Sequence, residues 1–433
     1  MFLKQLYSCF LESSGVTTDS RNISKGNMFF ALKGEKYDGH QFVPLALKSG
    51  CDKAVIDNTD FSVPGRTILV DNVFDSLLQL SAHHRNQFDI PVLAITGSNG
   101  KTTTKELIRE VLSSGYNTLA TYGNLNNHIG VPLTLLSLKD FHEFAVIEMG
   151  ANHQGEIDLL CRTAAPTHGL ITNAGTAHLE GFGSPEGVLR AKSELFIYLK
   201  NTGGIIFLNS NRPNLKTVVT DLDTPHESFG SGEDDFVTGR LIDSGDCLTI
   251  EVRLKKDGEC LTINTKLAGD YNLENVLAAV CVGSWFGIPG SGIKTAIENY
   301  IPDNNRSQII ETSENKLLMD AYNANPDSMK AALSNFLNMP GENKSVIIGD
   351  MLELGEYAAA EHRKIVEILT GSGFREVFLV GPEFYRTPAP DDFIRVKSIS
   401  ELSDLLRQNP LYGRFILLKG SRGIELEKCL PAL

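Results

Sequence analysis

Short apolar runs alternate with polar segments of helical length along most of this chain. Residues 92–95 read Val-Leu-Ala-Ile, and comparable runs occupy residues 144–148, 169–172 and 205–208. Such runs, separated by helical segments, are typical of strands in a parallel sheet joined by crossover helices. A second series follows at residues 317–320, 346–349, 377–380 and 415–418. The pattern therefore predicts an α/β protein with two successive parallel-sheet blocks.

Changes in this pattern divide the 433 residues into three blocks, and a chain of this length can form about three domains. Block 1–88 mixes short strands and helices. Block 89–300 opens with the run at 92–95 and later contains two alternating segments, 248–254 and 260–264, around an Asp-Gly turn. These segments predict a half-exposed β-hairpin. Block 301–433 holds the second series of strands.

A glycine-rich turn directly follows the strand at 92–95 and leads into a helical segment. Residues 95–105 read Ile-Thr-Gly-Ser-Asn-Gly-Lys-Thr-Thr-Thr-Lys. Glycines let backbone N–H groups converge on a phosphate at the helix N-terminus, while Lys101 reaches the terminal phosphates and Thr102 a bound Mg²⁺. The common P-loop spacing has a glycine where this chain has Ile95, so the loop is a variant. We expect the following residues to bind ATP: Gly97, Ser98, Asn99, Gly100, Lys101, Thr102 and Thr103.

Charge, cysteine content and hydropathy argue against several classes of protein. A net charge of −13 argues against nucleic acid as the main partner. The seven cysteines are scattered and form no CxxC pair, which favours reduced thiols in a cytosolic protein. No apolar stretch is long enough for a membrane span, and the N-terminus lacks the apolar run of a signal peptide. We expect a soluble, cytoplasmic protein without a membrane partner.

Three further residues lie near the expected ends of buried strands or on a neighbouring helix. Glu148 closes the strand at 144–148, where a carboxylate can hold Mg²⁺ beside a P-loop or can simply be solvated. His178 lies in a glycine-rich loop after another strand, although a lone histidine is usually structural. Lys192 falls in a helical segment, and by itself it reads as a solvent-exposed lysine.

Other polar residues are weaker candidates. Asn272 and Asn275 are spaced i, i+3 at a helix start, so their amides can read a base edge, unless one of them is only an N-cap. Arg306 could reach a phosphate across a domain gap, or could be a surface arginine. In the loop at 18–21, Ser20 and Arg21 could bind a diphosphate through the arginine fork.

Taken together, the motifs resemble one family. Thr-Gly-Ser-Asn-Gly-Lys-Thr, Glu-Met-Gly, Ala-His-Leu-Glu-Gly, Ala-Lys-Ser-Glu and Asn-Leu-Glu-Asn-Val-Leu-Ala-Ala resemble the Mur ligases of peptidoglycan synthesis, in order and spacing from about residue 18 to 423. That family has this shorter P-loop. The segments 124–132, 320–329 and 349–355 are similar to the members that add D-alanyl-D-alanine to a UDP-N-acetylmuramoyl-tripeptide. The Asp-Asn-Pro-Arg signature of diaminopimelate-adding members is missing.

The resemblance implies a UDP-muropeptide-binding domain (1–88), an ATP-binding central domain with the hairpin (89–300) and a C-terminal Rossmann-like domain (301–433). It implies a reaction in which ATP converts the tripeptide carboxylate to an acyl phosphate that the dipeptide amine attacks. It also implies roles for individual residues. The catalytic residues would be Lys101, His178 and Lys192, and Mg²⁺ would be bound by Thr102, Glu148, His178 and a carbamylated Lys192. The nucleotide would also contact Asn272, Asn275, Arg306 and Asp320. The UDP-muropeptide would be bound by Ser20, Arg21, Asn124 and Asn127, and D-alanyl-D-alanine by Asn323, Asn325 and Ser328.

Two positions depart from the family pattern, and other functions stay open. Tyr271 stands where a histidine is usual and Asn305 where a glycine is usual, both near the expected nucleotide contacts. A sister ligase that adds a diamino acid to the dipeptide precursor, or glutamate as in the folylpolyglutamate type, is the nearest alternative. A nucleotide-dependent switch is an alternative from another class. We expect a monomer, and the third residue of the tripeptide is left open between lysine and diaminopimelate.

Overall fold

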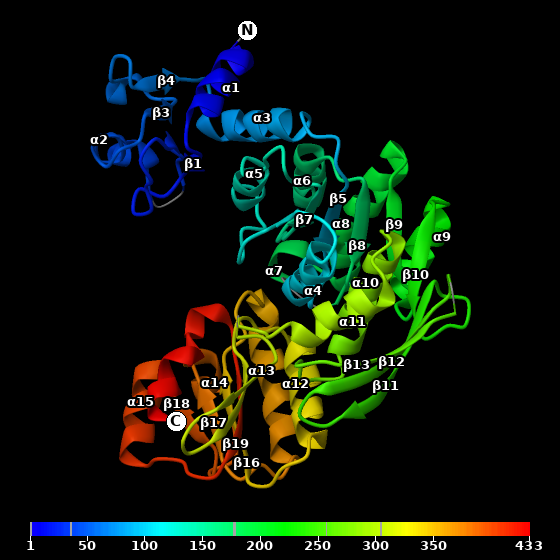
Figure 1. Ribbon diagram of the computed structural model, residues 1–433. Helices are drawn as coiled ribbons and strands as arrows, with labels where there is room; N and C mark the ends of the chain where they lie inside the picture. Colours follow the sequence, from blue (N-terminus) through cyan, green and yellow to red (C-terminus); the bar gives the residue numbers. More distant parts are fainter. Residues whose placement is uncertain (1, 35–36, 176–178, 257, 304) are drawn as a thin grey trace.

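The computed structural model describes every residue except 1, 35–36, 176–178, 257 and 304, and it contains three sheets in series (Figure 1). The N-terminal sheet has four parallel strands in chain order. Its elements are α1 (Phe2–Glu12), β1 (Val16–Thr17), β2 (Met28–Phe30), α2 (Val43–Lys48), β3 (Lys53–Ile56), β4 (Thr67–Leu69) and α3 (Val73–Arg85).

The central sheet has nine strands in the order β13-β12-β11-β10-β9-β8-β5-β7-β6, parallel from β6 to β11 and antiparallel from β11 to β13. Its strands are β5 (Val92–Thr96), β6 (Thr118–Ala120), β7 (Phe144–Glu148), β8 (His168–Ile171), β9 (Ile205–Asn209), β10 (His226–Gly230), β11 (Val237–Ser244), β12 (Leu248–Leu254) and β13 (Cys260–Asn264). Its helices are α4 (Lys101–Ser113), α5 (Gly130–Leu135), α6 (Glu156–Ala164), α7 (Leu179–Phe182), α8 (Pro185–Thr202), α9 (Pro213–Leu222), α10 (Asn272–Trp285) and α11 (Gly290–Asn299). The predicted hairpin is confirmed as β12 and β13.

The C-terminal sheet has the order β14-β15-β19-β16-β17-β18, and β14 is its antiparallel strand. Its elements are β14 (Gln308–Glu311), β15 (Lys316–Asp320), α12 (Pro326–Asn338), β16 (Lys344–Gly349), α13 (Ala358–Thr370), β17 (Val377–Val380), α14 (Pro382–Arg386), β18 (Ile394–Val396), α15 (Ile399–Gln408) and β19 (Phe415–Lys419). All eight runs predicted as strands are strands, which confirms the α/β class.

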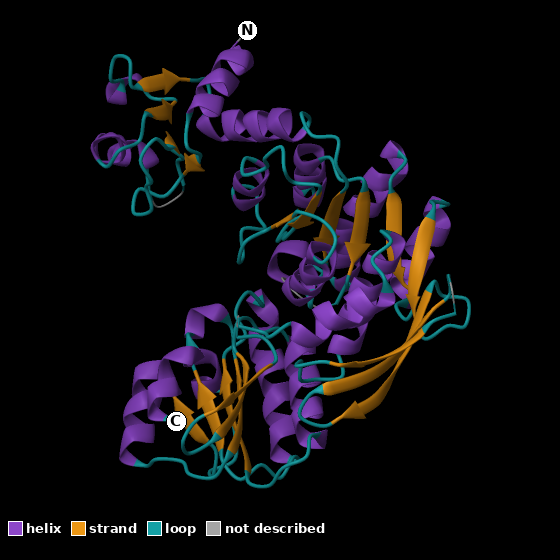
Figure 2. Cartoon of the chain, viewed as in Figure 1, coloured by secondary structure: helices purple, strands orange, loops and turns teal. Residues whose placement is uncertain are grey.

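Helices cover both faces of the central sheet (Figure 2). Leu93 and Ile95 of β5 pack into a core with α4, α10 and α11, whereas Val92 and Ala94 pack into a second core with α5, α6 and α8. Because successive side chains of a strand point to opposite faces, an entirely apolar strand needs such double cover. With both faces covered by helices, ligands are expected at the carboxyl ends of the parallel strands, as in other α/β proteins.

A buried arginine joins the first two parts of the chain. Arg85, at the end of α3, donates to the carbonyls of Ala164 and Ala165 at the end of α6 and to those of Phe88 and Ile90. The guanidinium thus satisfies carbonyl groups that helix ends leave unpaired. None of the described helices combines the length and the apolar character that a membrane span requires.

Candidate active site

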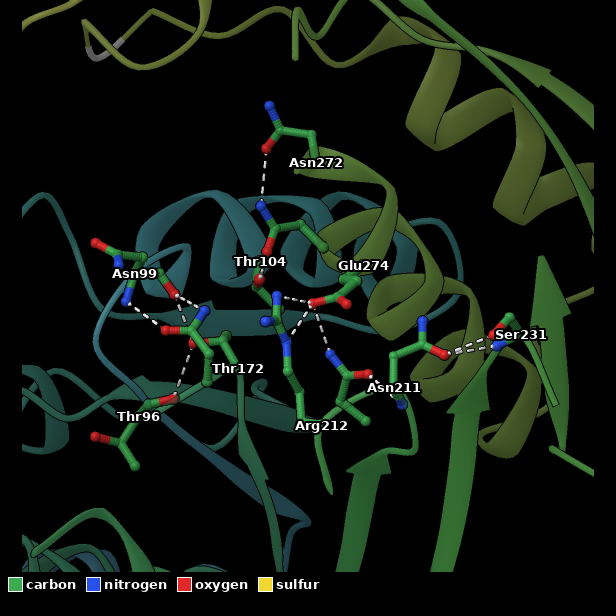
Figure 3. A network of polar contacts seen from close by, with 12 residues as sticks. Thr96, Asn99, Thr104, Thr172, Asn211, Arg212, Ser231, Asn272 and Glu274 are labelled. Carbon is green, nitrogen blue, oxygen red and sulfur yellow. Dashed lines mark hydrogen bonds and ion pairs between the residues drawn. The ribbon is translucent and has the colours of Figure 1, made fainter. Parts of the chain in front are cut away.

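The glycine-rich turn after β5 forms a compact loop at the N-terminus of α4. Gly97 (φ +145°) and Gly100 (φ +81°) both adopt left-handed backbone conformations. A Cβ at Gly97 would lie 2.0 Å from the Thr172 hydroxyl, so the turn requires glycine there. The Thr172 hydroxyl donates a hydrogen bond to the backbone carbonyl of Asn99 (2.6 Å), and both residues are labelled in Figure 3.

Lys101 folds back over this loop. Its Nζ donates to the carbonyls of Gly97 (2.6 Å) and Ser98 (3.3 Å). Burial lowers the pKa of Lys101 to about 8, while the carboxylate of Glu148 opposes that shift. The ammonium therefore stays largely protonated at neutral pH and places a positive charge beside the converging N–H groups.

Glu148 at the end of β7 is 1% exposed. Its Oε1 accepts hydrogen bonds from the Thr102 hydroxyl (3.2 Å) and the Asn126 amide (2.7 Å), whereas its buried Oε2 has no hydrogen-bond partner. An unpaired carboxylate oxygen beside a threonine hydroxyl is a donor set that suits a hard cation such as Mg²⁺. The described residues contain no group of three or more His, Cys, Asp or Glu side chains able to hold a metal, so further oxygen ligands would have to come from elsewhere.

Lys192 is not the solvent-exposed lysine that its local sequence suggests. It is 1% exposed on α8, donates to the carbonyl of Ala151 (3.3 Å) and lies 5.2 Å from the centre of the Phe182 ring. Burial, with repulsion from Lys101 as a smaller cause, lowers the pKa of Lys192 to about 7. Neutral amine is therefore abundant at physiological pH. The remaining predicted metal-site residue, His178, lies outside the described residues.

A cavity of about 460 Å³ lies between the carboxyl edge of the central sheet and the C-terminal part of the chain. Its central wall is the loop 98–103 together with the turn after β9, and the opposite wall comes from β15, α12 and β19. On the central wall Glu274 accepts hydrogen bonds from Arg212 (2.6 Å) and Asn209 (2.9 Å), as Figure 3 shows for the labelled pair Arg212 and Glu274.

The two predicted nucleotide-reading asparagines form a buried ladder. Asn272 donates to the Ala268 carbonyl (2.7 Å) and the Ser307 hydroxyl (3.1 Å), and accepts from the Asn275 amide (2.8 Å). Asn275 in turn accepts from the Thr104 hydroxyl of α4 (3.0 Å), and Figure 3 labels Thr104 and Asn272. Both asparagines border the cavity, but these polar atoms already have protein partners.

The C-terminal wall supplies the other predicted nucleotide contacts. The Arg306 guanidinium stacks 3.9 Å from the centre of the Tyr322 ring, and its buried Nε has no hydrogen-bond partner. Asp320 pairs with the buried Lys419 (2.6 Å). Asn305, at the position of a family glycine, has φ +56°, a left-handed conformation that asparagine tolerates better than most residues. The hydroxyl of Tyr271, the other departure, lies 2.9 Å from that of Ser307.

The residues expected to bind D-alanyl-D-alanine border the same cavity. Asn325 is the N-cap of α12 and forms a capping box with Ser328. Its amide also donates to the side chain of Asn99 (2.7 Å), so the N-cap of a C-terminal helix contacts the P-loop directly. Asn323 accepts a hydrogen bond from the N–H of Ala324.

The predicted muropeptide residues lie apart from this cavity. Arg21 is 89% exposed in its side chain and pairs with Asp19 (2.9 Å), next to Ser20. Asn124 is exposed, and Asn127 accepts from two N–H groups at the start of α5. Asn126, between them, is the residue that reaches Glu148, and sequence reasoning missed it although it lies within the quoted motif. Arg212 and Glu274 were also missed, and no local signal marked them.

Three family models match consecutive parts of the chain: "Mur ligase family, catalytic domain" at residues 12–80, "Mur ligase middle domain" at 95–283 and "Mur ligase, glutamate ligase domain" at 305–422. The chain is 35% identical to UDP-N-acetylmuramoyl-tripeptide--D-alanyl-D-alanine ligase of Bacillus subtilis, over 97% of this chain and 93% of that protein. The crystal structure of MurF from Acinetobacter baumannii aligns with a TM-score of 0.87 and 30% identity, covering 99% and 97%. The MurF ligase of Thermotoga maritima, solved in complex with ADP, aligns with a TM-score of 0.85 and 26% identity, covering 98% and 97%.

Proposed function

This chain belongs to the Mur ligase family of ATP-dependent, amide-forming ligases, and we propose that it joins D-alanyl-D-alanine to a UDP-N-acetylmuramoyl-tripeptide in peptidoglycan precursor synthesis. The name and nearly full coverage of the Bacillus subtilis relative support this substrate pair. The observation that carries the chemistry is the position of Glu148. At the carboxyl end of β7, its Oε1 accepts a hydrogen bond from Thr102 of the P-loop, and its Oε2 is buried without a hydrogen-bond partner.

In the proposed reaction the terminal carboxylate of the tripeptide attacks the γ-phosphorus of ATP, and the bond to the ADP oxygen breaks. Lys101 and Arg306 would face the transferring phosphoryl group, because both line the cavity and both carry positive charge. Thr102 and Glu148 would hold Mg²⁺, with His178 as a further ligand, and the ion would neutralise phosphate charge. The amine of the dipeptide then attacks the acyl phosphate, and phosphate leaves with one of the original carboxylate oxygens.

The walls of the cavity support a role in excluding water. An acyl phosphate hydrolyses if water reaches it, and a site closed between two domains removes that competitor. The contact between Asn325 and Asn99 brings the C-terminal wall onto the P-loop. We assign Asn323, Asn325 and Ser328 to the dipeptide, Asn272, Asn275 and Asp320 to the nucleotide, and Ser20, Arg21, Asn124 and Asn127 to the UDP-muropeptide. Domain boundaries at 88/89 and 300/301 belong to the same proposal.

We also propose that Lys192 is carbamylated. Its neutral amine would attack CO₂ and lose a proton, which turns a buried cation into a carboxylate-like Mg²⁺ ligand near Lys101. Burial of the amine and its pKa of about 7 support this reaction. Lys192→Ala is expected to lose most activity and to regain part of it with short-chain carboxylic acids, but not with bicarbonate. Lys200→Ala, on the exposed side of the same helix, is the matched control, and full activity in Lys192→Ala would contradict the proposal.

The cytoplasm is the proposed compartment, because it supplies ATP and keeps free cysteines reduced. We also propose that the protein acts as a monomer.

Phosphate release with a panel of amines tests the function. Turnover should require both the UDP-muramoyl-tripeptide and D-alanyl-D-alanine. Turnover with L-lysine, diaminopimelate or L-glutamate and the shorter precursor would favour the sister ligase instead. ATP turnover that is independent of both substrates would favour a nucleotide-dependent switch.

A further inference from the structure

Lys105 is a fully buried cation on α4 that the reaction above does not use. Its Nζ donates to the carbonyl of Thr121 (2.6 Å) and pairs with Glu106 (2.7 Å). A buried ammonium loses several kcal/mol of hydration, so its partners must be well placed to compensate. It lies three residues after Thr102, on the same side of the helix.

Thr121 connects Lys105 to the end of β7. The Thr121 carbonyl accepts from Lys105, its N–H donates to the carbonyl of Val146 (3.0 Å), and its hydroxyl accepts from the N–H of Glu148 (3.0 Å). Thr121 is buried. The backbone of Glu148 is therefore held by a residue that Lys105 fixes to α4.

The carboxylate of Glu148 depends on the same loop. Thr121 begins the segment that leads to Asn126, and the Asn126 amide orients Oε1 of Glu148 (2.7 Å). Thr102 holds the same oxygen from α4 (3.2 Å). Helix α4 thus reaches Glu148 twice, directly through Thr102 and through Lys105 and Thr121.

We propose that Lys105 is a positioning residue, which orients the metal-binding carboxylate of Glu148 through Thr121. The inference rests on the proposed Mg²⁺ site. Removing a group that orients a metal ligand typically weakens metal affinity about 10- to 100-fold. Lys105 itself would touch neither metal nor substrate.

The test measures binding of Mn²⁺, as a probe for Mg²⁺, to the full chain with a non-hydrolysable ATP analogue, by electron paramagnetic resonance. Lys105→Met should weaken Mn²⁺ binding about 10- to 100-fold, while binding of the analogue in EDTA changes less than about twofold. Thr121→Val, which loses the hydroxyl but keeps the carbonyl, should also weaken Mn²⁺ binding. Thr121→Ser, which keeps the hydroxyl, should not. Ile108→Val, a buried change on α4 that removes no contact to Glu148, controls for general loss of stability.

Mn²⁺ affinity within about twofold of the parent chain in folded Lys105→Met would overturn the proposal. If Lys105→Met does not fold, unchanged Mn²⁺ affinity in Thr121→Val would overturn the proposal, because the Thr121 hydroxyl makes the hydrogen bond to the N–H of Glu148. Failure of the proposed function is separate: the parent chain would then bind Mn²⁺ and nucleotide but show no turnover dependent on D-alanyl-D-alanine.

Discussion

Replacing Asn272 by leucine separates two roles for the asparagine ladder. The side chain is 1% exposed, and leucine has a similar volume but no polar atoms. The change removes the bonds to the Ala268 carbonyl, the Ser307 hydroxyl and the Asn275 amide. The Ser307 hydroxyl keeps its Tyr271 neighbour, so two buried groups lose a partner.

Each buried polar group that loses its partner costs about 1–3 kcal/mol, so for two such groups we expect the free energy of unfolding to fall by about 2–6 kcal/mol. Urea unfolding of the full chain by circular dichroism measures this loss, and steady-state kinetics give the KM for ATP. Asn214→Leu is the matched control, because Asn214 lines the same cavity but is only half-buried. Its amide donates to the Ala174 carbonyl (3.3 Å) and accepts from the adjacent N–H of Leu215 (2.9 Å). We expect it to lose less than about 1 kcal/mol.

The opposite pattern would refute this reasoning. If Asn272→Leu unfolds at the urea concentration of the parent chain while its KM for ATP rises tenfold or more, Asn272 contacts the nucleotide but its hydrogen bonds do not stabilise the fold.

Two further predictions concern stability. Burial lowers the pKa of His168 to about 4, whereas an unfolded histidine binds a proton below about pH 6.5. The unfolded state therefore gains a proton that the folded state does not bind as the pH falls below 6.5. We expect the free energy of unfolding to decrease by about 2 kcal/mol between pH 7.5 and pH 5. Urea midpoints should show this loss and His168→Phe should reduce it, whereas equal pH dependence in the two would contradict the cause. Arg85→Lys should lower the free energy of unfolding by about 2–3 kcal/mol, since one ammonium cannot replace a guanidinium that serves four carbonyls. A change below about 0.5 kcal/mol in the same assay would show that these bonds contribute little.

Local sequence was sufficient where one segment determines the structure. The P-loop was predictable because strand, glycine turn, lysine and helix are consecutive, and β5 was predictable because it is buried on both faces. Strand β11 was not predicted: it contains Gly239, its exposure is irregular, and its register shifts between Leu241 and Asp243. Its pairing with β12 depends on the fold around it.

Several contacts in the site join residues that are far apart in the sequence, and these contacts could not be predicted. Asn126 reaches Glu148, and Arg212 reaches Glu274, from positions 22 and 62 residues apart, so only the folded sheet brings them together. The burial of Lys192 has the same origin, because its helix packs across the sheet face. The resemblance indicated Glu148 and Lys192, whereas the groups that contact them could be identified only from the structure.

The most direct test of the account follows the carboxylate oxygens of the substrate. UDP-N-acetylmuramoyl-tripeptide labelled with a heavy oxygen isotope in its terminal carboxylate is incubated with the protein, ATP and D-alanyl-D-alanine, and both products are analysed by mass spectrometry. The account predicts a muropeptide extended by the dipeptide and released phosphate that carries one labelled oxygen. Unlabelled phosphate, or ATP turnover without extension of the muropeptide, would contradict it.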